Sequence, residues 1–298
     1  MADSVVSVRN FSKQFNSTPV VRDLSFDVQT GETFAFLGAN GSGKTTTIRC
    51  LLNILQPTGG ELLLWGERYD ISMARRIGYL PEERGLYVDS NVLETMVYFG
   101  MLKGLSKADA MSKAAGYLDR VGLSEKRQAR IKTLSSGQQQ KIQLGLTIIN
   151  SPELLVLDEP TKGLDPVNRD LLLDTLTEMK AAGTTIVFIT HQMEEVEKVA
   201  DRLVMIKDGR RVLYGGVAEV KRQFGENRLH IEFTGTVPVH EKLYSVDRAE
   251  NNVAELKLCD GVTPDQVFKA LAKDRLVMSK FEVASPSLQD IFVHVQSQ

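Results

Sequence analysis

A glycine-rich segment, GANGSGKTT at residues 38–46, contains residue types that bind phosphate groups. It follows the apolar run TFAFLG and precedes TTTIRCLLNIL, which has helical spacing, so strand, loop and helix stand in the order that such a loop requires. The N–H groups of the loop and of the helix N-terminus are expected to point at phosphate oxygens. Lys44 is expected to neutralise the β and γ phosphates of a nucleoside triphosphate, and the Thr45 hydroxyl to bind Mg²⁺. The predicted phosphate-binding residues are Gly38, Asn40, Gly41, Ser42, Gly43, Lys44, Thr45 and Thr46.

Two adjacent acidic residues follow a second apolar run, in LLVLDEP at residues 154–160. Asp158 stands at the carboxyl end of the expected strand, where ligands of open α/β sheets collect, and it is expected to hold Mg²⁺ through the water shell of the ion. Glu159 is expected to orient or deprotonate the water that attacks the γ-phosphate. Acidic surface residues after a strand are common, but the phosphate-binding loop upstream favours the catalytic interpretation.

The elements that must position these residues are predicted from short apolar runs that alternate with helical patterns, as in a parallel sheet covered by helices. TFAFLG, ELLVLD and TTIVFIT are unalternated runs, as expected of strands buried on both faces. Residues 168–183 carry leucines at helical spacing and end at Gly183, a C-terminal cap. The almost wholly helical stretch at about 83–150 is predicted to be an insertion into this α/β core.

The pattern changes near Gly225, after which short apolar runs such as RLHIEFTG and LVMSKFEV accompany the helical PDQVFKALAKD. A stretch of about 70 residues with this pattern predicts a small α+β domain. The expected domains are therefore residues 1–225, which include the helical insertion, and residues 226–298.

Composition excludes several classes of protein. The net charge of −2 and the pI near 6.2 do not favour nucleic-acid binding, which normally requires an excess of Lys and Arg. Cys50 and Cys259 have no metal-like spacing and the four histidines are scattered, so a disulfide scaffold and a zinc site are both unfavoured. No stretch approaches the roughly 20 apolar residues that span a bilayer, and the N-terminus does not resemble a signal peptide, so a cytoplasmic chain is expected.

Three further motifs accompany these two: LSSGQ (134–138) lies between them, and GLDP (163–166) and THQ (190–192) follow the second. Over residues 5–224 the combination resembles the ATP-binding cassette (ABC) family, with LSSGQ at the position of the signature loop. The resemblance implies an α/β P-loop NTPase core with an inserted helical subdomain. It also implies that the signature loop contacts the γ-phosphate held by a second copy, and an exposed helix N-terminus is indeed a ready anion site. A plain helix cap by a serine is the alternative interpretation. The residues carried over to this loop are Ser135, Ser136, Gly137 and Gln138.

The same resemblance implies further roles. Phe15 matches the aromatic residue that stacks on adenine, although a lone aromatic in a strand is more often part of the core. His191 matches the switch histidine that contacts the γ-phosphate, and Asp165 matches the D-loop carboxylate that communicates between the two sites. Glu82 aligns with the Q-loop glutamine of the family. A glutamate there can still bind Mg²⁺ or the attacking water, but it adds negative charge beside phosphate. Glu83 and a merely solvated PEER turn are the alternatives.

The sequence thus predicts an ATP hydrolase that uses ATP and Mg²⁺ and works as a dimer, with a second copy or with a paralogous cassette. A transport role would require separate integral membrane permease subunits, with this chain bound at the inner face of the cell membrane. YLPEERGLY and the final SPSLQDIFVHV resemble the ATPase subunits of bacterial sodium and drug exporters. A soluble ABC ATPase without a transport role is one alternative, but it would usually contain two cassettes or a long coiled-coil insertion. A P-loop kinase is the other, and it leaves LSSGQ unexplained.

Overall fold

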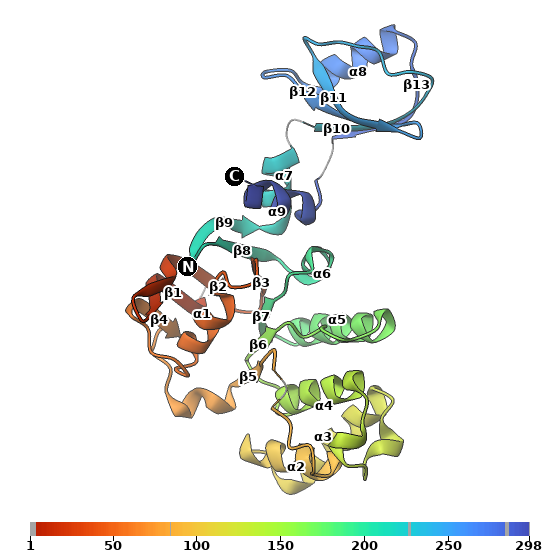
Figure 1. Ribbon diagram of the computed structural model, residues 1–298. Coiled ribbons are helices and arrows are strands. Elements are labelled where there is room, and N and C mark those ends of the chain that lie inside the picture. The colour runs from red at the N-terminus through yellow and green to blue at the C-terminus, as the bar shows by residue number, and fades with distance from the viewer. Residues whose placement is uncertain (1–3, 84, 226–227, 284–285, 298) are drawn as a thin grey trace. The chain divides into compact units, whose positions relative to one another are not determined.

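The chain forms two compact units, the first ending at Gly215 and the second beginning at Gly216 (Figure 1). The first unit is an α/β structure with an inserted group of helices, and the second is a small α+β structure, so the predicted fold class is confirmed. Within the part of the chain that the structure describes, no helix is long and apolar enough to cross a membrane. The computed structural model describes residues 4–83, 85–225, 228–283 and 286–297.

A six-stranded sheet forms the centre of the first unit. Its strands are β3 (Thr33–Gly38), β5 (Ile77–Leu80), β6 (Leu154–Asp158), β7 (Thr185–Ile189), β8 (Arg202–Lys207) and β9 (Arg210–Gly216). They lie in the order β5-β6-β7-β3-β8-β9, and the neighbours from β5 to β8 are parallel (Figure 1). Every residue of β3, β6 and β7 is buried, as their unalternated apolar runs predict. Because parallel strands end at the same edge, the segments that follow β3, β6 and β7 come together there.

An antiparallel three-stranded sheet packs against this core. Its strands are β1 (Ser4–Phe15), β2 (Thr18–Gln29) and β4 (Gly59–Leu64), in the order β2-β1-β4. The two sheets share an apolar core in which the rings of Phe26 on β2 and Phe34 on β3 stack with centroids 5.5 Å apart. The packing of β1 and β2 therefore fixes where the end of β1 lies relative to β3.

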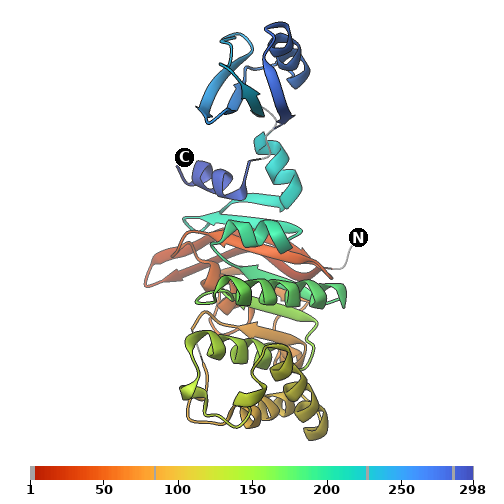
Figure 2. The ribbon, with the colours of Figure 1, turned by 90° about the vertical axis from the view of Figure 1, so that its right-hand side faces the viewer.

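The helical insertion forms a lobe beyond the β5 edge of the large sheet (Figures 1 and 2). Its helices are α2 (Val92–Leu102), α3 (Lys107–Arg120) and α4 (Ser136–Ile148). Asn91, Ser106 and Ser135 cap their N-termini, each by accepting a hydrogen bond from a backbone N–H in the first turn. Buried residues such as Met96 and Ile142 pack these helices into an apolar core of their own.

The glutamine-rich start of α4 is not a solvated surface. Gln140 is buried and its Nε2 donates to the carbonyl oxygen of Pro160 at 2.9 Å, and the Nε2 of Gln143 donates to the carbonyl of Pro81 at 3.4 Å. These carbonyls belong to the segments that follow β6 and β5. The glutamines therefore tie the helical lobe to the carboxyl edge of the large sheet.

Three further helices complete the first unit. They are α1 (Lys44–Leu51), α5 (Pro166–Ala181) and α6 (Met193–Val199). Each begins shortly after a strand of the large sheet: α1 after β3, α5 after β6 and α6 after β7. The predicted helix at 168–183 corresponds to α5, and Gly183 follows its end with a φ of 97°. The helix N-termini thus lie at the same edge of the sheet as the predicted site residues.

The second unit contains a four-stranded antiparallel sheet in the order β11-β12-β10-β13. Alternate residues of β10 and β12, such as Leu229, Ile231 and Leu256, are buried with Val267 and Leu271 of α8. Its elements are β10 (Arg228–Thr234), β11 (Tyr244–Glu250), β12 (Val253–Leu258), β13 (Val277–Val283), α7 (Val217–Gly225), α8 (Pro264–Lys273) and α9 (Leu288–Ser297).

The boundary between the units lies before α7, whereas the sequence predicts it after Gly225. Helix α7 belongs to the second unit because it packs against α9, where the rings of Phe224 and His294 lie 6.0 Å apart. This contact joins residues far apart in the sequence, so the change in local pattern at Gly225 could not reveal it.

Candidate nucleotide-binding site

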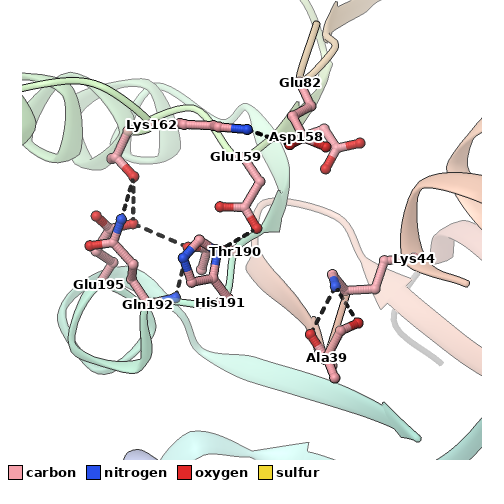
Figure 3. Close-up of polar contacts among 12 residues, drawn as sticks. Ala39, Lys44, Glu82, Asp158, Glu159, Lys162, Thr190, His191, Gln192 and Glu195 are labelled. Atoms are coloured by element: carbon pink, nitrogen blue, oxygen red, sulfur yellow. Dashed lines mark hydrogen bonds and ion pairs between the residues drawn. The ribbon is translucent and has the colours of Figure 1, made fainter. Parts of the chain in front are cut away.

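A pocket of about 610 Å³ opens at the carboxyl edge of the large sheet. It brings together the predicted phosphate-binding loop, both acidic residues after β6, the switch histidine, Glu82 and Phe15, together with two residues that the sequence did not indicate, Val20 and Lys162. Figure 3 shows most of its charged side chains. The lining residues are Phe15, Val20, Asn40, Gly41, Gly43, Lys44, Thr45, Thr46, Glu82, Asp158, Glu159, Lys162 and His191.

The loop between β3 and α1 needs glycine at two positions for steric reasons. A Cβ on Gly38 would lie 2.5 Å from the Ile206 carbonyl oxygen and 2.5 Å from Ser42 Oγ. Gly43 has a φ of 105°, and a Cβ there would lie 2.7 Å from Val21 Cγ2. Gly43 is also the N-cap of α1, so the tight loop delivers the N–H groups of a helix N-terminus to the pocket.

Two predicted loop residues, Gly38 and Ser42, are not part of the described lining of the pocket. The Ser42 hydroxyl is buried and has no hydrogen-bond partner among the described residues. A buried polar atom without a partner is unusual in a folded protein and is typical of a site that receives a ligand or water. The fit to a phosphate ligand rests on the backbone N–H groups of the loop and of the α1 N-terminus.

The Lys44 ammonium is bound by its own loop. Its Nζ donates to the carbonyl oxygens of Gly38 at 2.8 Å and Ala39 at 3.1 Å (Figure 3). Burial lowers the pKa of Lys44, and the negative charges of Glu159, Asp158 and Glu82 oppose that shift. An ammonium group has three donors, so the two carbonyl bonds leave capacity for a phosphate oxygen.

The two predicted magnesium ligands contact each other. Thr45 Oγ1 donates to Oδ2 of Asp158 at 2.7 Å. Asp158 is almost wholly buried, and burial raises its pKa, whereas the Thr45 hydrogen bond and the Lys44 charge lower it. A hydroxyl and a carboxylate are the hard oxygen donors that Mg²⁺ prefers, so this donor set fits the ion.

Glu159 has a conformation that few residues adopt. Its φ is 51°, a left-handed backbone that costs about 1–3 kcal/mol in a residue other than glycine and that is typical of functional sites. Its Oε1 lies 2.9 Å from Nδ1 of His191, whereas its Oε2 is buried and has no partner among the described atoms (Figure 3). Glu159 therefore has one oxygen oriented by His191 and one that remains available to a water molecule.

Glu82 contacts Lys162 rather than the phosphate-binding loop. Lys162 Nζ lies 2.7 Å from Glu82 Oε1 (Figure 3). Glu82 lines the pocket and Glu83 does not, so the geometry favours Glu82 over the alternative at the Q-loop position. The Glu82 side chain is 41% exposed, so it is a solvated carboxylate in the wall of the pocket that Asp158 and Lys44 also line.

Glu195 on α6 is a buried carboxylate that the sequence did not indicate, because it stands in the charged run MEEVEK. Its Oε2 accepts from the hydroxyls of Thr161 at 3.0 Å and Thr190 at 3.4 Å (Figure 3). Its Oε1 lies 3.4 Å from Nε of Arg169. Burial raises its pKa, and the Thr161 bond and the Arg169 charge oppose the shift. Thr161 follows β6 and Thr190 follows β7, so Glu195 holds the ends of these two strands together.

Phe15 stands at the end of β1 with 43% of its surface exposed, so it is not part of the core. Its ring lines the pocket, and Nζ of Lys13 lies 4.7 Å from the ring centroid. An exposed ring in the wall of the pocket has the chemistry needed to stack on a nucleotide base.

The signature residues are not part of the pocket of their own chain, as far as its described lining shows. Ser135 caps α4: its Oγ accepts from the Gln138 N–H at 3.3 Å, and the Gln138 side chain accepts from the Ser135 N–H at 3.0 Å. Ser136 begins the helix, and an added Cβ on Gly137 would lie 3.8 Å from the D-loop carbonyl of Gly163. The cap interpretation is thus correct, and it leaves the Ser135 O–H group as a donor.

Asp165, the predicted D-loop carboxylate, also caps a helix. Its Oδ1 accepts from the backbone N–H of Asn168 at 3.0 Å at the start of α5. The bonds from the Asn168 backbone and side chain lower its pKa. Like the signature residues, Asp165 does not line the described pocket.

Comparison with known proteins identifies the family. Residues 21–162 match the ABC transporter family, and residues 215–296 match the family described as ATP-binding protein DrrA1-3-like, C-terminal domain. An ABC transporter ATP-binding protein of Alkalihalophilus pseudofirmus is 42% identical over 259 residues, which cover 86% of this chain and 97% of the relative. Nod factor export ATP-binding protein I of Burkholderia lata is 33% identical over 295 residues, which cover 97% of this chain and 96% of the relative.

The fold agrees with these matches. A solved structure of the ATP binding subunit of an ABC transporter superposes with a TM-score of 0.70 at 30% sequence identity, and covers 74% of this chain and 94% of its own. The phosphate-binding loop, the Asp158 and Glu159 pair and the His191 contact therefore stand on the fold of an ATP-binding cassette. The chain belongs to the family of ABC transporter ATP-binding proteins, which are ATPases.

Proposed function

We propose that two copies of this chain close around two ATP molecules and hydrolyse them to drive a separate membrane permease. One observation carries the proposal. The pocket is lined by groups for the phosphates, the base and the attacking water of one ATP molecule, whereas Ser135 to Gln138 lie outside the pocket of their own chain. A paralogous cassette could replace the second copy, because it would supply the same signature loop.

Binding of ATP is assigned to the loop between β3 and α1. Its backbone N–H groups hold the phosphates, Lys44 neutralises them, and Phe15 stacks on the adenine. Thr45 and Asp158 would hold Mg²⁺, with Glu82 as a further acidic group nearby, and the ion would polarise the phosphate oxygens. The hydroxyl–carboxylate contact at 2.7 Å supports this assignment.

Hydrolysis is assigned to Glu159 and His191. Glu159 accepts a hydrogen bond from the attacking water through its unpartnered Oε2 and so directs the water at the γ-phosphate. His191 orients the carboxylate through Nδ1 and contacts the γ-phosphate with the rest of its exposed ring.

The partner copy completes the site with its signature loop. Ser135, Ser136, Gly137 and Gln138 present the N-terminus of α4, and the positive end of a helix stabilises a γ-phosphate. The D-loop runs beside that helix, where Gly137 approaches Gly163, so Asp165 at the end of the same loop is positioned to report the state of one site to the other.

Docking of the permease is assigned to an apolar groove of about 300 Å³ between the large sheet and the helical lobe. Ile54, Leu86 and Phe99 contribute to its walls, and 57% of the surface of Ile54 is exposed. Exposed apolar surface of this kind marks an interaction site. A permease segment at this groove would hold the chain at the inner face of the cell membrane. Export is the direction that we assign, because the Nod factor relative is an export protein that matches nearly the whole chain.

Co-purification from detergent-solubilised membranes tests the proposal. An integral membrane protein should be retained by the wild-type chain and should stimulate its ATPase activity after reconstitution. Ile54→Glu should abolish both effects, whereas Met111→Glu, at an exposed apolar residue outside the groove, should change neither. Steady ATP hydrolysis with no membrane partner in either assay would favour a soluble ABC ATPase without a transport role.

A further inference from the structure

The ion pair between Glu82 and Lys162 lies in the wall of the nucleotide pocket, and the catalytic scheme above gives Lys162 no role. Exposed ion pairs usually contribute little to stability, and both side chains are substantially exposed, at 41% for Glu82 and 62% for Lys162. The pair matters because both of its residues line the nucleotide pocket, and not because it stabilises the fold.

Three carboxylates line the pocket: Glu82, Asp158 and Glu159. Apart from Lys162, the only ammonium group in the described lining is that of Lys44. The charge of Glu82 acts on both Lys44 and Asp158. Burial lowers the pKa of Lys44 and raises that of Asp158, and the Glu82 charge opposes the first shift and adds to the second. An uncompensated Glu82 would therefore repel a triphosphate held at Lys44.

The fold holds both members of the pair in place through their backbones. Glu82 follows β5, Lys162 follows β6, and these strands are neighbours in the sheet. The Lys162 N–H donates to the Glu159 carbonyl at 3.2 Å. The side chains of Gln140 and Gln143 on α4 bind the carbonyls of Pro160 and Pro81, one in each segment. These backbone contacts therefore keep Glu82 and Lys162 within reach of each other.

We propose that Lys162 is a positioning residue of the nucleotide site: it offsets the charge of Glu82, so that a glutamate at the Q-loop position is compatible with a bound triphosphate. Without Lys162 the pocket would present one ammonium to three carboxylates, and with it the Glu82–Lys162 pair is neutral. The inference rests on the nucleotide-binding roles proposed above.

A double-mutant cycle on the full chain tests this inference. ATP affinity is measured by calorimetry in EDTA, so that no metal contributes, for the wild type, Lys162→Met, Glu82→Gln and the double variant. Lys162→Met should weaken binding about three- to tenfold, because it leaves a carboxylate beside the phosphates, and the loss should shrink in high salt. The double variant should bind within about twofold of the wild type, because it restores a neutral pair.

Lys198 and Asp170 provide the matched control. Their ion pair, with Nζ–Oδ1 at 2.8 Å, is similarly exposed and does not line the pocket. Lys198→Met removes the same charge from the chain, and Lys198→Met with Asp170→Asn removes the same kind of pair, so neither should change ATP affinity. The inference is wrong if Lys162→Met binds ATP as well as Lys198→Met does. It is also wrong if the double variant stays as weak as Lys162→Met, because Lys162 would then contact the nucleotide directly. A wild-type chain that bound no ATP would contradict the nucleotide site itself rather than the pairing.

Discussion

Glu159 and His191 share one hydrogen bond, from Nδ1 to Oε1 at 2.9 Å, which joins the residues that follow β6 and β7. A carboxylate accepts hydrogen bonds, so Nδ1 must donate. In a neutral imidazole Nε2 is then an acceptor, and it can donate to a γ-phosphate only when the ring carries a second proton. The contact with Glu159 therefore fixes the tautomer of His191, and with it the role that Nε2 has toward a γ-phosphate.

Glu159→Gln should cut the rate of ATP hydrolysis by about two orders of magnitude or more and leave ATP binding intact, because an amide cannot deprotonate water. Single-turnover hydrolysis and equilibrium ATP binding measure the two effects. Glu153→Gln is the control. Glu153 is an exposed glutamate that directly precedes β6, whereas Glu159 directly follows that strand. Glu153 pairs with Arg76 and does not line the pocket. Near-normal turnover in Glu159→Gln would remove Glu159 from the mechanism.

Lys44→Ala should weaken ATP binding itself by about 10- to 100-fold, since a hydrogen bond to a charged group contributes about 1.5–3 kcal/mol. Lys103→Ala is a matched control. Nζ of Lys103 also donates to two backbone carbonyls, those of Ala74 at 2.6 Å and Ile77 at 2.8 Å, and burial also lowers its pKa, but it does not line the nucleotide pocket. Equal losses of ATP affinity in the two variants would mean that Lys44 acts through the stability of the fold.

Ser135→Arg should block ATP-driven dimerisation and hydrolysis but leave ATP binding to the single chain unchanged, because the phosphate-binding loop belongs to a different segment. Mixing Ser135→Arg with Lys44→Ala should restore part of the hydrolysis. In a two-fold dimer of the two variants, one composite site collects both defects and the other collects neither. ATPase titration of one variant with the other measures the recovery. Wild-type activity of Ser135→Arg, or loss of its ATP binding, would contradict a role for the loop in the partner's site.

Glu195→Gln should change how stability depends on pH. Because burial raises the pKa of Glu195 in the folded chain, the folded state favours the protonated carboxyl. The stability that this gives the wild type is complete below the ordinary pKa of a glutamate and is lost as the pH rises through the raised value. An amide does not titrate, so the free energy of unfolding of the wild type should fall relative to that of Glu195→Gln as the pH rises above the ordinary pKa of a glutamate.

Urea unfolding at a series of pH values measures that difference, and only its slope is informative, since an amide at this position also changes the hydrogen bonds with Thr161 and Thr190. Glu178→Gln is the control: Arg120 lowers the pKa of Glu178, whose contribution is lost only as the pH falls through that lowered value, so its difference should be flat over the same range. A flat difference for Glu195→Gln as well would show that its carboxyl is not protonated more readily in the folded chain.

Several features of the site were predictable because they depend on contiguous residues. The phosphate-binding loop is one: strand, glycines and helix N-terminus follow one another within residues 33–51, so the local order decides the chemistry. Glu159 is another, because it follows its buried strand directly. At the Q-loop position the sequence predicted Glu82 with Glu83 as an alternative, because the two residues are adjacent and only their surroundings distinguish them.

The sequence by itself determined the chemical groups of this protein: a loop for phosphate, an acidic pair after a strand, a histidine after the next strand and a serine-capped helix. Only the tertiary structure decided which side chains meet, including Lys162 and Glu195, which the sequence did not indicate. Thr45 contacts Asp158, Lys162 pairs with Glu82, and Glu195 joins Thr161 to Thr190. Most of these partners are tens of residues apart in the chain. Their contacts depend on the strand order β5-β6-β7-β3, which is set by how the sheets and helices bury their apolar faces together and not by any local propensity.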